Sequence, residues 1–158
     1  MGLVQQIRKS SLGVELSDQQ AEVLAKLANV SRLAEGQYLI EEGIRDDRLH
    51  VLLDGKLEVV KKAGMGEETS LHVLREGDMA GQLSFVDPVV HSLGLRALCA
   101  CEIFSLKRDD FESLITVEPK LVYKDMCAIM RSGHGILHRM NLQHMELSNY
   151  VYKQHGRY

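Results

Sequence analysis

Apolar and polar residues alternate with a period of two through the middle of the chain, from about residue 30 to residue 106. This alternation is typical of strands that have one face in a core and the other in water. The apolar stretches are short and are separated by glycine-containing turns, which predicts about eight strands in a jelly roll. The clearest strands are expected at residues 30–33, 38–40, 49–53, 57–60, 70–74, 93–98 and 101–106.

Two turns between these strands have recognisable residues. Asp54-Gly55 is a tight hairpin signal, so the strands on either side of it are expected to pair. Residues 63–66 contain two glycines and predict a looser hairpin tip. Cys99 and Cys101 are separated by one residue, which in a strand places both on one face, as small buried apolar side chains.

A helical period appears at both ends of the chain. Ser17 followed by Gln20 is a capping box, which predicts that a helix begins there and ends near residue 29. A shorter helix is expected at residues 3–9 and another at residues 108–115. Pro119 suits the first position of a long helix. The fold class is therefore mainly β with flanking helices, with a β-roll domain over residues 1–118 and a long helix over residues 119–158.

Apolar residues in the long helix keep an alternating 4–3 spacing through four heptads, which predicts the seam of a parallel two-helix dimer. Gly133 would cost a lone helix roughly 1 kcal/mol relative to alanine, and a close approach of two backbones would account for it. The seam is expected to contain Met126, Ile129, Gly133, Ile136, Met140 and Leu147. A second apolar row, expected to face the β body, contains Tyr123, Met130, Leu137 and Val151. The alternative is a helix that only covers its own barrel.

Charge and composition narrow the partners. The net charge of -3 leaves no basic footprint for nucleic acid. Residues 119–158 carry six Lys and Arg against two acids, which favours a basic helix on an acidic body over a nucleic-acid surface. No apolar run approaches the ~18 residues of a membrane span, and no basic-then-apolar leader is present, so a cytoplasmic protein without a membrane partner is expected.

The stretch Gly81-Gln82-Leu83-Ser84 follows a strand and reads as a loop that opens into one turn of helix, with His91-Ser92 a short loop later. The first N–H groups of a helix have no partner within the helix, so such a turn can bind an anion. The sequence therefore predicts an anion pocket at this stretch.

The order of elements resembles the cyclic-nucleotide-binding domain of the catabolite activator protein (CRP/FNR-like) family. Six short motifs carry the resemblance in register over about residues 15 to 150: Glu42-Gly43, Leu53-Asp54-Gly55, Glu76-Gly77-Asp78, Gly81-x-Leu83-Ser84, Ala100-Cys101-Glu102-Ile103 and Asp110-Phe111. It implies a jelly roll that binds a cyclic nucleotide and signals through a dimer. Regulators of this family have a helix-turn-helix after the long helix, and the chain ends near Tyr158, so DNA binding is disfavoured.

In that family the phosphate cassette reads Gly-Glu-(Leu/Ile)-(Ala/Ser), followed about seven residues later by Arg-(Ser/Thr/Ala)-Ala. The glutamate binds the ribose hydroxyl and the arginine pairs with the phosphate. Gln82 stands at the glutamate position, where losing a charge-assisted bond costs on the order of 1 kcal/mol. His91 stands at the arginine position, where losing a guanidinium–phosphate pair costs roughly 2–5 kcal/mol. The resemblance thus implies a ligand site lined by Gly81, Gln82, Leu83, Ser84, His91 and Ser92, in which the cassette is degenerate.

These departures leave three readings of the pocket: an altered site for a different small nucleotide-like or anionic effector, weak binding of cAMP or cGMP, or a decayed pocket in a protein-interaction module. Haem is a fourth, because some family members sense gas through haem, and the available axial ligands are His50, His72, His91 and Cys99. We find no Ser–His–acid, paired-carboxylate or Walker pattern and predict no enzyme. His134 and His138 have i, i+4 spacing but are expected to be solvated rather than metal ligands.

Overall fold

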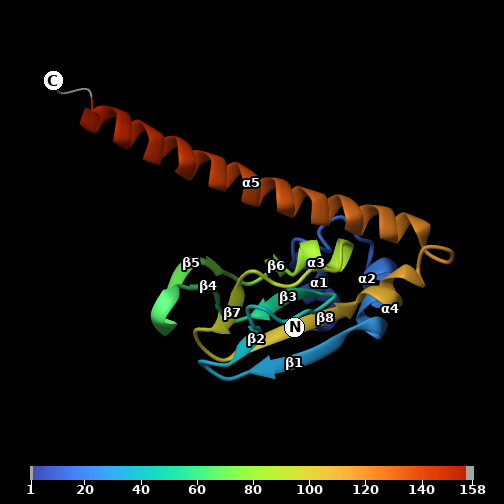
Figure 1. Cartoon of the computed structure of the whole chain (residues 1–158). Helices are drawn as coiled ribbons and strands as arrows, with labels where there is room; N and C mark the ends of the chain where they lie inside the picture. Colours follow the sequence, from blue (N-terminus) through green and yellow to red (C-terminus); the bar gives the residue numbers. More distant parts are fainter. Residues whose placement is uncertain (1, 156–158) are drawn as a thin grey trace.

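The computed structural model describes residues 2–155, which form a β-roll with helices against one side and a long C-terminal helix across it (Figure 1). The roll consists of two four-stranded antiparallel sheets, so the predicted eight-stranded fold is confirmed. The first sheet has the order β1 (Asn29–Leu33), β8 (Cys101–Lys107), β3 (Arg48–Asp54) and β6 (Met79–Ala80). The second has the order β2 (Tyr38–Ile40), β7 (Gly94–Ala97), β4 (Leu57–Lys62) and β5 (Glu68–Leu74).

The Asp54-Gly55 turn does not close a hairpin, so that prediction is wrong. β3 pairs with β6 and β8, whereas β4 pairs with β5 and β7, so the chain crosses here from one sheet to the other. Gly55 has φ 99°, and a Cβ at this position would lie 2.6 Å from the carbonyl oxygen of Ala100. The residues specify a tight turn, but they do not specify which strands pair beyond it.

The β4–β5 hairpin is confirmed, with a 3₁₀ turn at its tip (Gly64–Gly66). β6 is not among the strands expected from the sequence, because two residues are too few to show an alternating pattern. Cys101 is buried between the sheets, whereas Cys99 lies in a bend after β7 and is only half-buried. Both nevertheless contact the same apolar cluster.

Apolar side chains form two layers of core. The inward faces of the two sheets meet between the strands, where the buried residues include Leu52, Leu57, Ala97 and Ile103. The outward face of β3 and β8 packs beneath the helices, and Leu49, Val51, Phe104 and Leu106 there are at most 1% exposed. Because successive side chains in these two strands alternate between the layers, both strands are buried on both faces.

The N-terminal helices α1 (Leu3–Lys9) and α2 (Asp18–Leu27) cover the second layer. The capping box forms as predicted: Gln20 N–H donates to the Ser17 hydroxyl at 3.2 Å, and Ser17 N–H donates to the Gln20 side chain at 3.1 Å. After β8 a short helix, α4 (Arg108–Glu112), leads to α5 (Pro119–His155). The last three residues of the predicted helical domain lie outside the described residues.

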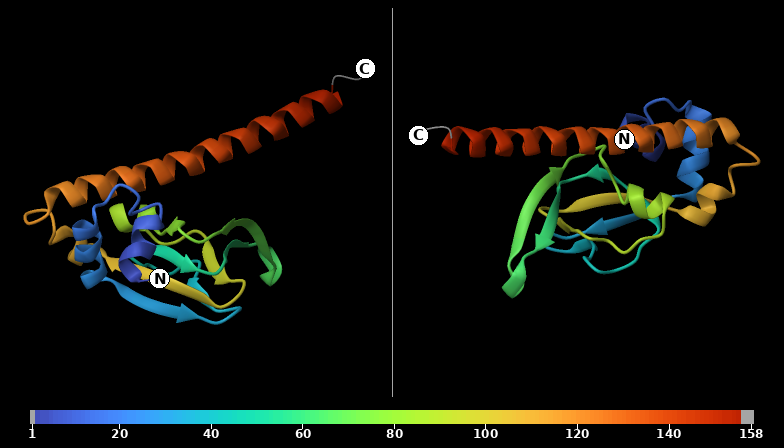
Figure 2. Two further views of the ribbon diagram at one scale, coloured as in Figure 1. Left: turned by 180° about the vertical axis from the view of Figure 1, so that it is seen from behind. Right: turned by 45° about the horizontal axis from the view of Figure 1, so that its top comes forward.

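Two segments of α5 have different surroundings (Figure 2). The first, residues 119–132, we call the docked segment, because Leu121, Ala128 and Ile129 join the core beneath the helices. The second, residues 133–155, we call the exposed segment, because it projects from the body and nearly all of its described side chains are exposed. Within the described residues, no helix is long and apolar enough to cross a membrane. The cytoplasmic location stays a prediction.

The assignment of the two apolar rows is wrong in the docked segment. Ile129 is 5% exposed and Met126 packs against the same core, so these two seam positions face the chain's own body. Tyr123 and Met130, expected to face the body, are 71% and 73% exposed. Nothing in the described part of the chain lies within 4 Å of a Cβ built at Gly133, so the chain's own body does not account for this glycine, and its place in a two-helix seam stays a prediction. Which apolar row of α5 faces the body depends on how well its side chains fit the core, and heptad spacing carries no information about this fit.

Candidate functional site

The candidate site begins where β6 ends and α3 (Gln82–Val86) starts. Gly81 precedes the helix with φ 81°, a left-handed conformation that favours glycine. A Cβ at Gly81 would lie 2.7 Å from the backbone oxygen of Arg48 and 3.5 Å from the ring of His50. The glycine therefore allows the loop both to turn and to lie directly against β3. The backbone conformation expected from the sequence is present.

The side chain of Gln82 points to the long helix. Its amide nitrogen donates to the Ser132 hydroxyl of α5 at 2.8 Å and to the Met79 carbonyl at 3.2 Å. Both amide hydrogens are therefore used within the protein, and only the amide oxygen can serve a ligand hydroxyl. A glutamate could accept from the Ser132 hydroxyl but could not bond to the Met79 carbonyl, because an ionised carboxylate only accepts.

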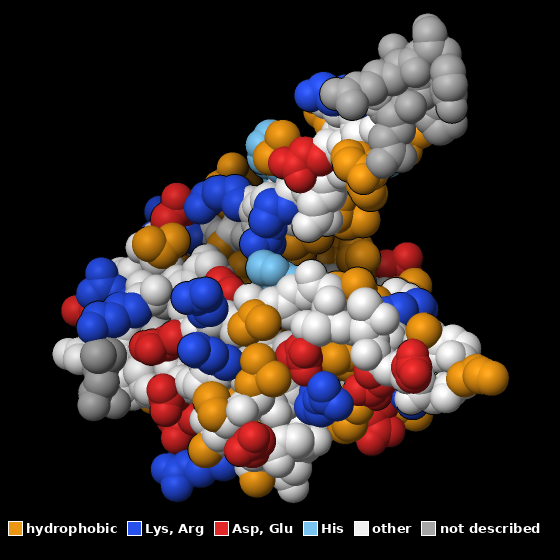
Figure 3. All heavy atoms as spheres, turned by 90° about the vertical axis from the view of Figure 1, so that its left-hand side faces the viewer, with side chains coloured by type: hydrophobic (Ala, Val, Ile, Leu, Met, Phe, Trp, Pro, Cys, Tyr) orange, Lys and Arg blue, Asp and Glu red, His pale blue; other side chains and the backbone are white. Residues whose placement is uncertain are grey.

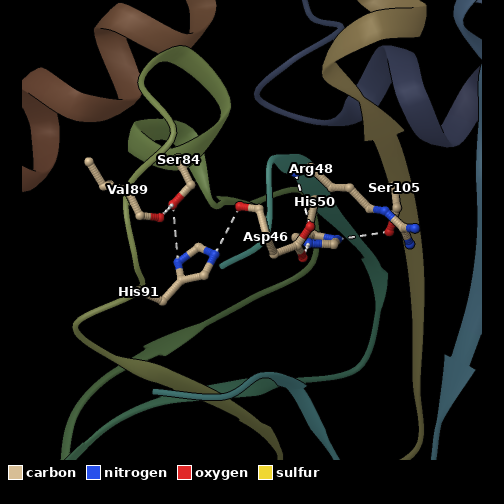
Figure 4. Close-up of polar contacts among 7 residues, drawn as sticks. All are labelled: Asp46, Arg48, His50, Ser84, Val89, His91 and Ser105. Carbon is tan, nitrogen blue, oxygen red and sulfur yellow. Dashed lines mark hydrogen bonds and ion pairs between the residues drawn. The ribbon is translucent and has the colours of Figure 1, made fainter. Parts of the chain in front are cut away.

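His91 lies between α3 and the loop before β3 (Figure 4). Its Nε2 is 3.2 Å from the backbone oxygen of Asp46, and its Nδ1 is 3.3 Å from the Ser84 hydroxyl. A carbonyl only accepts, so Nε2 carries a hydrogen. The Ser84 hydroxyl is also 3.4 Å from the Val89 carbonyl. It can donate to Nδ1 of a neutral imidazole, or donate to Val89 and accept from an imidazolium, so the contacts suit either charge state.

Behind the cassette, Asp46, His50 and Ser105 form a hydrogen-bonded row (Figure 4), in which His50 and Ser105 are buried and Asp46 is half-buried. His50 bonds to the Ser105 hydroxyl through Nδ1 at 2.8 Å and to the Asp46 carboxylate through Nε2 at 2.9 Å. Burial raises the pKa of Asp46, but the hydrogen bonds and charges of His50 and Arg48 together outweigh burial and leave the pKa below its ordinary value. Asp46 thereby holds His50 with its side chain and His91 with its backbone.

The sequence shows no Ser–His–acid pattern, but the fold brings such residues together: Ser105 from β8, His50 from β3 and Asp46 from a loop. Their arrangement differs from a hydrolase triad, in which the serine bonds to Nε2 and the acid to Nδ1. His50 and Ser105 are 3% and 6% exposed, so a substrate cannot reach the hydroxyl. The row supports the loop rather than performing chemistry.

Arg108 fixes the other end of α3. Its guanidinium donates to the carbonyls of Phe85 at 2.7 Å and Ser84 at 2.6 Å. These carbonyls end the short helix, where a cation is favourable. Sequence reasoning missed Arg108, Asp46 and Ser132, because each acts on a segment far away in the chain. Arg96, on β7, is bound by Glu58 and Glu68 and does not supply charge to the cassette.

The remaining predicted ligand positions are at the periphery. Leu83 is 80% exposed, and Ser92 is exposed, with its carbonyl bonded to Lys61 at 2.9 Å. A cavity of about 150 Å³ lies elsewhere, over the second sheet, and its lining includes Tyr38, Glu42 and Glu68 but no predicted ligand residue. The Glu68 side chain accepts a hydrogen bond from Tyr38, which raises the pKa of that tyrosine.

The proposed haem ligands are not gathered into one site. Both ring nitrogens of His50 are occupied, as described above. His72 is exposed on β5 and contacts Arg139, whereas Cys99 lies in the bend after β7. Among the residues that the structure describes, no group of three or more His, Cys, Asp or Glu could hold a metal ion. His134 and His138 are exposed on α5, as predicted.

Residues 30–117 match the family described as Cyclic nucleotide-binding domain. A CRP-like cAMP-activated global transcriptional regulator of Mycobacterium tuberculosis (strain ATCC 25618 / H37Rv) is 29% identical over 86 residues, covering 54% of this chain and 38% of that protein. The cGMP-dependent protein kinase, isozyme 1, of Drosophila melanogaster is 30% identical over 135 residues, covering 82% and 16%. This chain thus spans well under half of the length of either relative.

A solved structure with the same fold is the N-terminal domain of a transcriptional regulator from Streptomyces coelicolor A3(2). It is 27% identical, with a TM-score of 0.73, and the match covers 85% of this chain and 94% of that one. The likeness therefore includes the β-roll and a large part of the flanking helices.

Proposed function

The chain belongs to the cyclic nucleotide-binding domain family, and on that premise we propose that it is a non-enzymatic regulatory sensor with an altered cassette. The cassette takes a small anionic or nucleotide-like effector between α3 and the His91 loop, with weakened affinity for cAMP and cGMP. The effector state is signalled through a dimer.

The observation that carries this proposal is the backbone of the cassette. Gly81 keeps the left-handed turn and the close contact with Arg48 that only glycine allows without strain. Arg108 holds the carbonyl end of α3, and Asp46 holds His91. A loop that had lost its ligand altogether would not need both supports. The two supports therefore favour a cassette that still binds a ligand.

The expected weakening follows from the two departures. His91 supplies at most one hydrogen bond at Nδ1 while Nε2 stays on Asp46, where an arginine would supply a fixed charged fork. The Gln82 amide can accept a ribose hydroxyl only through its oxygen, because its hydrogens are bonded to Met79 and Ser132. The site thus offers less positive charge than the family pattern implies, so an effector with a different anionic group or a weaker affinity is expected.

Thermal unfolding in the presence of cAMP, cGMP, AMP and inorganic phosphate tests the sensor. At a ligand concentration ten times Kd, stability should rise by roughly 1.4 kcal/mol, or about 3–6 °C. His91→Ala should remove most of this shift, because it removes the side chain between Ser84 and Asp46. The control is His138→Ala, which changes an exposed histidine on α5 and should leave the shift intact.

A second candidate function is a ligand-free interaction module, which one observation favours. Both altered side chains already have partners within the protein, Gln82 on Ser132 and His91 on Asp46. Such bonds would stabilise an empty pocket. If none of the four ligands moves the unfolding midpoint at millimolar concentration, the sensor is refuted and the module is retained.

We further propose that the exposed segment of α5 pairs with a second copy. Its apolar side chains leave a large exposed surface, and Figure 3 shows hydrophobic side chains along the projecting helix and in the hollow beneath it. Met126 and Ile129 belong to the core and are not part of this surface. The exposed residues proposed for the interface are Ile136, Met140 and Leu147, at 39%, 58% and 65% exposed.

A double substitution tests the pairing. Ile136→Glu with Met140→Glu should raise the dimer dissociation constant at least tenfold, because two charges would face an apolar seam. Sedimentation at tens of micromolar should show a dimer for the wild type and a monomer for the variant. Met65→Glu, at the 99% exposed hairpin tip, is the control. A monomeric wild type at that concentration would remove the dimer from the proposed mechanism.

A further inference from the structure

A buried carboxyl lies in the centre of the contact between α5 and the body. Asp125 is 0% exposed, and both of its oxygens are without a hydrogen-bond partner among the described residues. Leu121, one turn earlier, is 0% exposed, and Ala128 and Ile129, one turn later, are each 5% exposed. A charged carboxylate in such surroundings is strongly disfavoured, because neither water nor a counter-ion reaches it.

The apolar residues that share a core with the docked segment of α5 come from α1, α2 and the loop between them. Ile7 and Leu12 are 1% exposed, Leu24 is 0% exposed, and all three belong to the same core cluster as the docked segment of α5. Asp125 therefore occupies a position that the pattern of the helix reserves for an apolar residue. An apolar residue at this position would avoid the cost of burying a carboxyl without a partner, so the presence of an acid calls for a role other than packing.

Charged side chains around this contact have other partners. The bonded pairs are Arg8 with Asp18, Arg131 with Glu15, and Lys124 with Gln20. The other charged side chains of α1 and α2 are exposed: Lys9, Glu22 and Lys26. Burial is the only cause that raises the pKa of Asp125 from its ordinary 3.8 to about 8, with no contribution from a neighbouring charge.

We propose that Asp125 makes the docking of α5 a proton-controlled lock: the docked segment is held while this carboxyl is neutral and is released when it ionises. The docked state binds the proton more tightly than the released state does. Docking is therefore fully favoured below about pH 4 and weakens as pH rises toward about 8. The equilibrium constant for docking falls by up to tenfold per pH unit in this window, and is independent of pH above it.

The lock reaches the cassette through Ser132. Ser132 is seven residues after Asp125, about 10 Å along the helix, and it accepts the hydrogen bond from Gln82. Release of the docked segment would remove this acceptor and free one hydrogen of the Gln82 amide. Proton concentration thus acts on the cassette through α5, independently of which effector the cassette takes.

Hydrogen–deuterium exchange of residues 119–132 between pH 6 and pH 9 tests the lock on the full chain. The wild type is compared with Asp125→Asn at each pH, so that intrinsic exchange rates cancel. The protection of the wild type relative to the variant should fall by up to tenfold per pH unit from pH 6 to 8 and then level off. Peptides from β8 should keep their protection throughout, since only α5 is released.

Two outcomes would overturn the lock: a ratio that does not change with pH, or a loss of β8 protection in parallel with α5, which would mean global unfolding. Asp125→Leu is the second variant if the asparagine does not fold, and it should give the same pH-independent docking. Glu146→Gln, on the exposed segment, is the control and should follow the wild type at every pH.

Discussion

Gly81→Ala is expected to lower the free energy of unfolding by roughly 2–4 kcal/mol and to abolish any effector response. A left-handed backbone costs a non-glycine residue roughly 1–2 kcal/mol, and Gly81 has φ 81°. The added methyl group would also lie 2.7 Å from the Arg48 carbonyl oxygen, which is backbone of a central strand and cannot move aside alone. The cassette loop would have to leave β3. Urea unfolding measures the loss.

Gly36→Ala separates the two causes of the stability loss expected for Gly81→Ala, which are the left-handed backbone and the close contact with Arg48. Gly36 has φ 84°, almost the same as Gly81, but nothing lies within 4 Å of the methyl group that would be added there. Only the cost of the left-handed backbone should remain, so the free energy of unfolding is expected to fall by roughly 1–2 kcal/mol. If the two variants lose the same stability, the close approach of the cassette to β3 does not constrain the loop.

The parts of the fold that the sequence predicted are those that depend on neighbouring residues. The capping box at Ser17, the β4–β5 tip and the helix after Gly81 each formed as expected, because local geometry fixes them. The Asp54-Gly55 turn was predicted as a turn but given the wrong consequence. Strand pairing is decided by the packing of the two sheets, and a dipeptide carries no information about it.

The long helix shows the same limit. Its heptad spacing predicted two apolar rows, and both exist, but the docked segment turns the Ile129 row to the body and leaves Tyr123 outside. Two rows with similar hydrophobicity differ in shape, and only the complete core selects between them. The heptad spacing also does not predict that Asp125 is buried, since a periodicity argument does not detect a single polar residue on an apolar face.

In the candidate site, sequence reasoning found the residues that differ from the family pattern but not what they now do. Gln82 is a donor to Ser132 and Met79, and His91 rests on Asp46 and Ser84. Ser132 lies 50 residues from Gln82 and Asp46 lies 45 residues from His91, and the direction of the nearer Met79 carbonyl and Ser84 hydroxyl depends on the fold. Each replacement is therefore more than a loss of charge, because a glutamate could not donate to Ser132 and an arginine could not accept from Ser84.

His91→Arg is expected to raise the affinity for cAMP by about 30- to several-thousand-fold, which corresponds to roughly 2–5 kcal/mol. The guanidinium would add a permanent, bidentate partner for the phosphate. The structure leaves room in the hydrogen-bond scheme for this change: Ser84 can donate to the Val89 carbonyl, 3.4 Å away, and the Asp46 carbonyl can still accept. Titration calorimetry measures the gain.

Gln82→Glu, which would restore the other family residue, is expected not to help when made alone. The carboxylate could still accept from the Ser132 hydroxyl, but it would lose the bond to Met79, worth roughly 1 kcal/mol, and would place a negative charge beside that carbonyl. The gain of a charge-assisted bond to ribose is of similar size, so the two effects should nearly cancel.

His91→Lys is the matched control for His91→Arg, because it supplies charge without the planar fork, and it should recover only part of the arginine gain. If His91→Arg binds cAMP no better than the wild type does, the shape of the pocket has changed as well as its charge, because the missing guanidinium would then not be what limits binding.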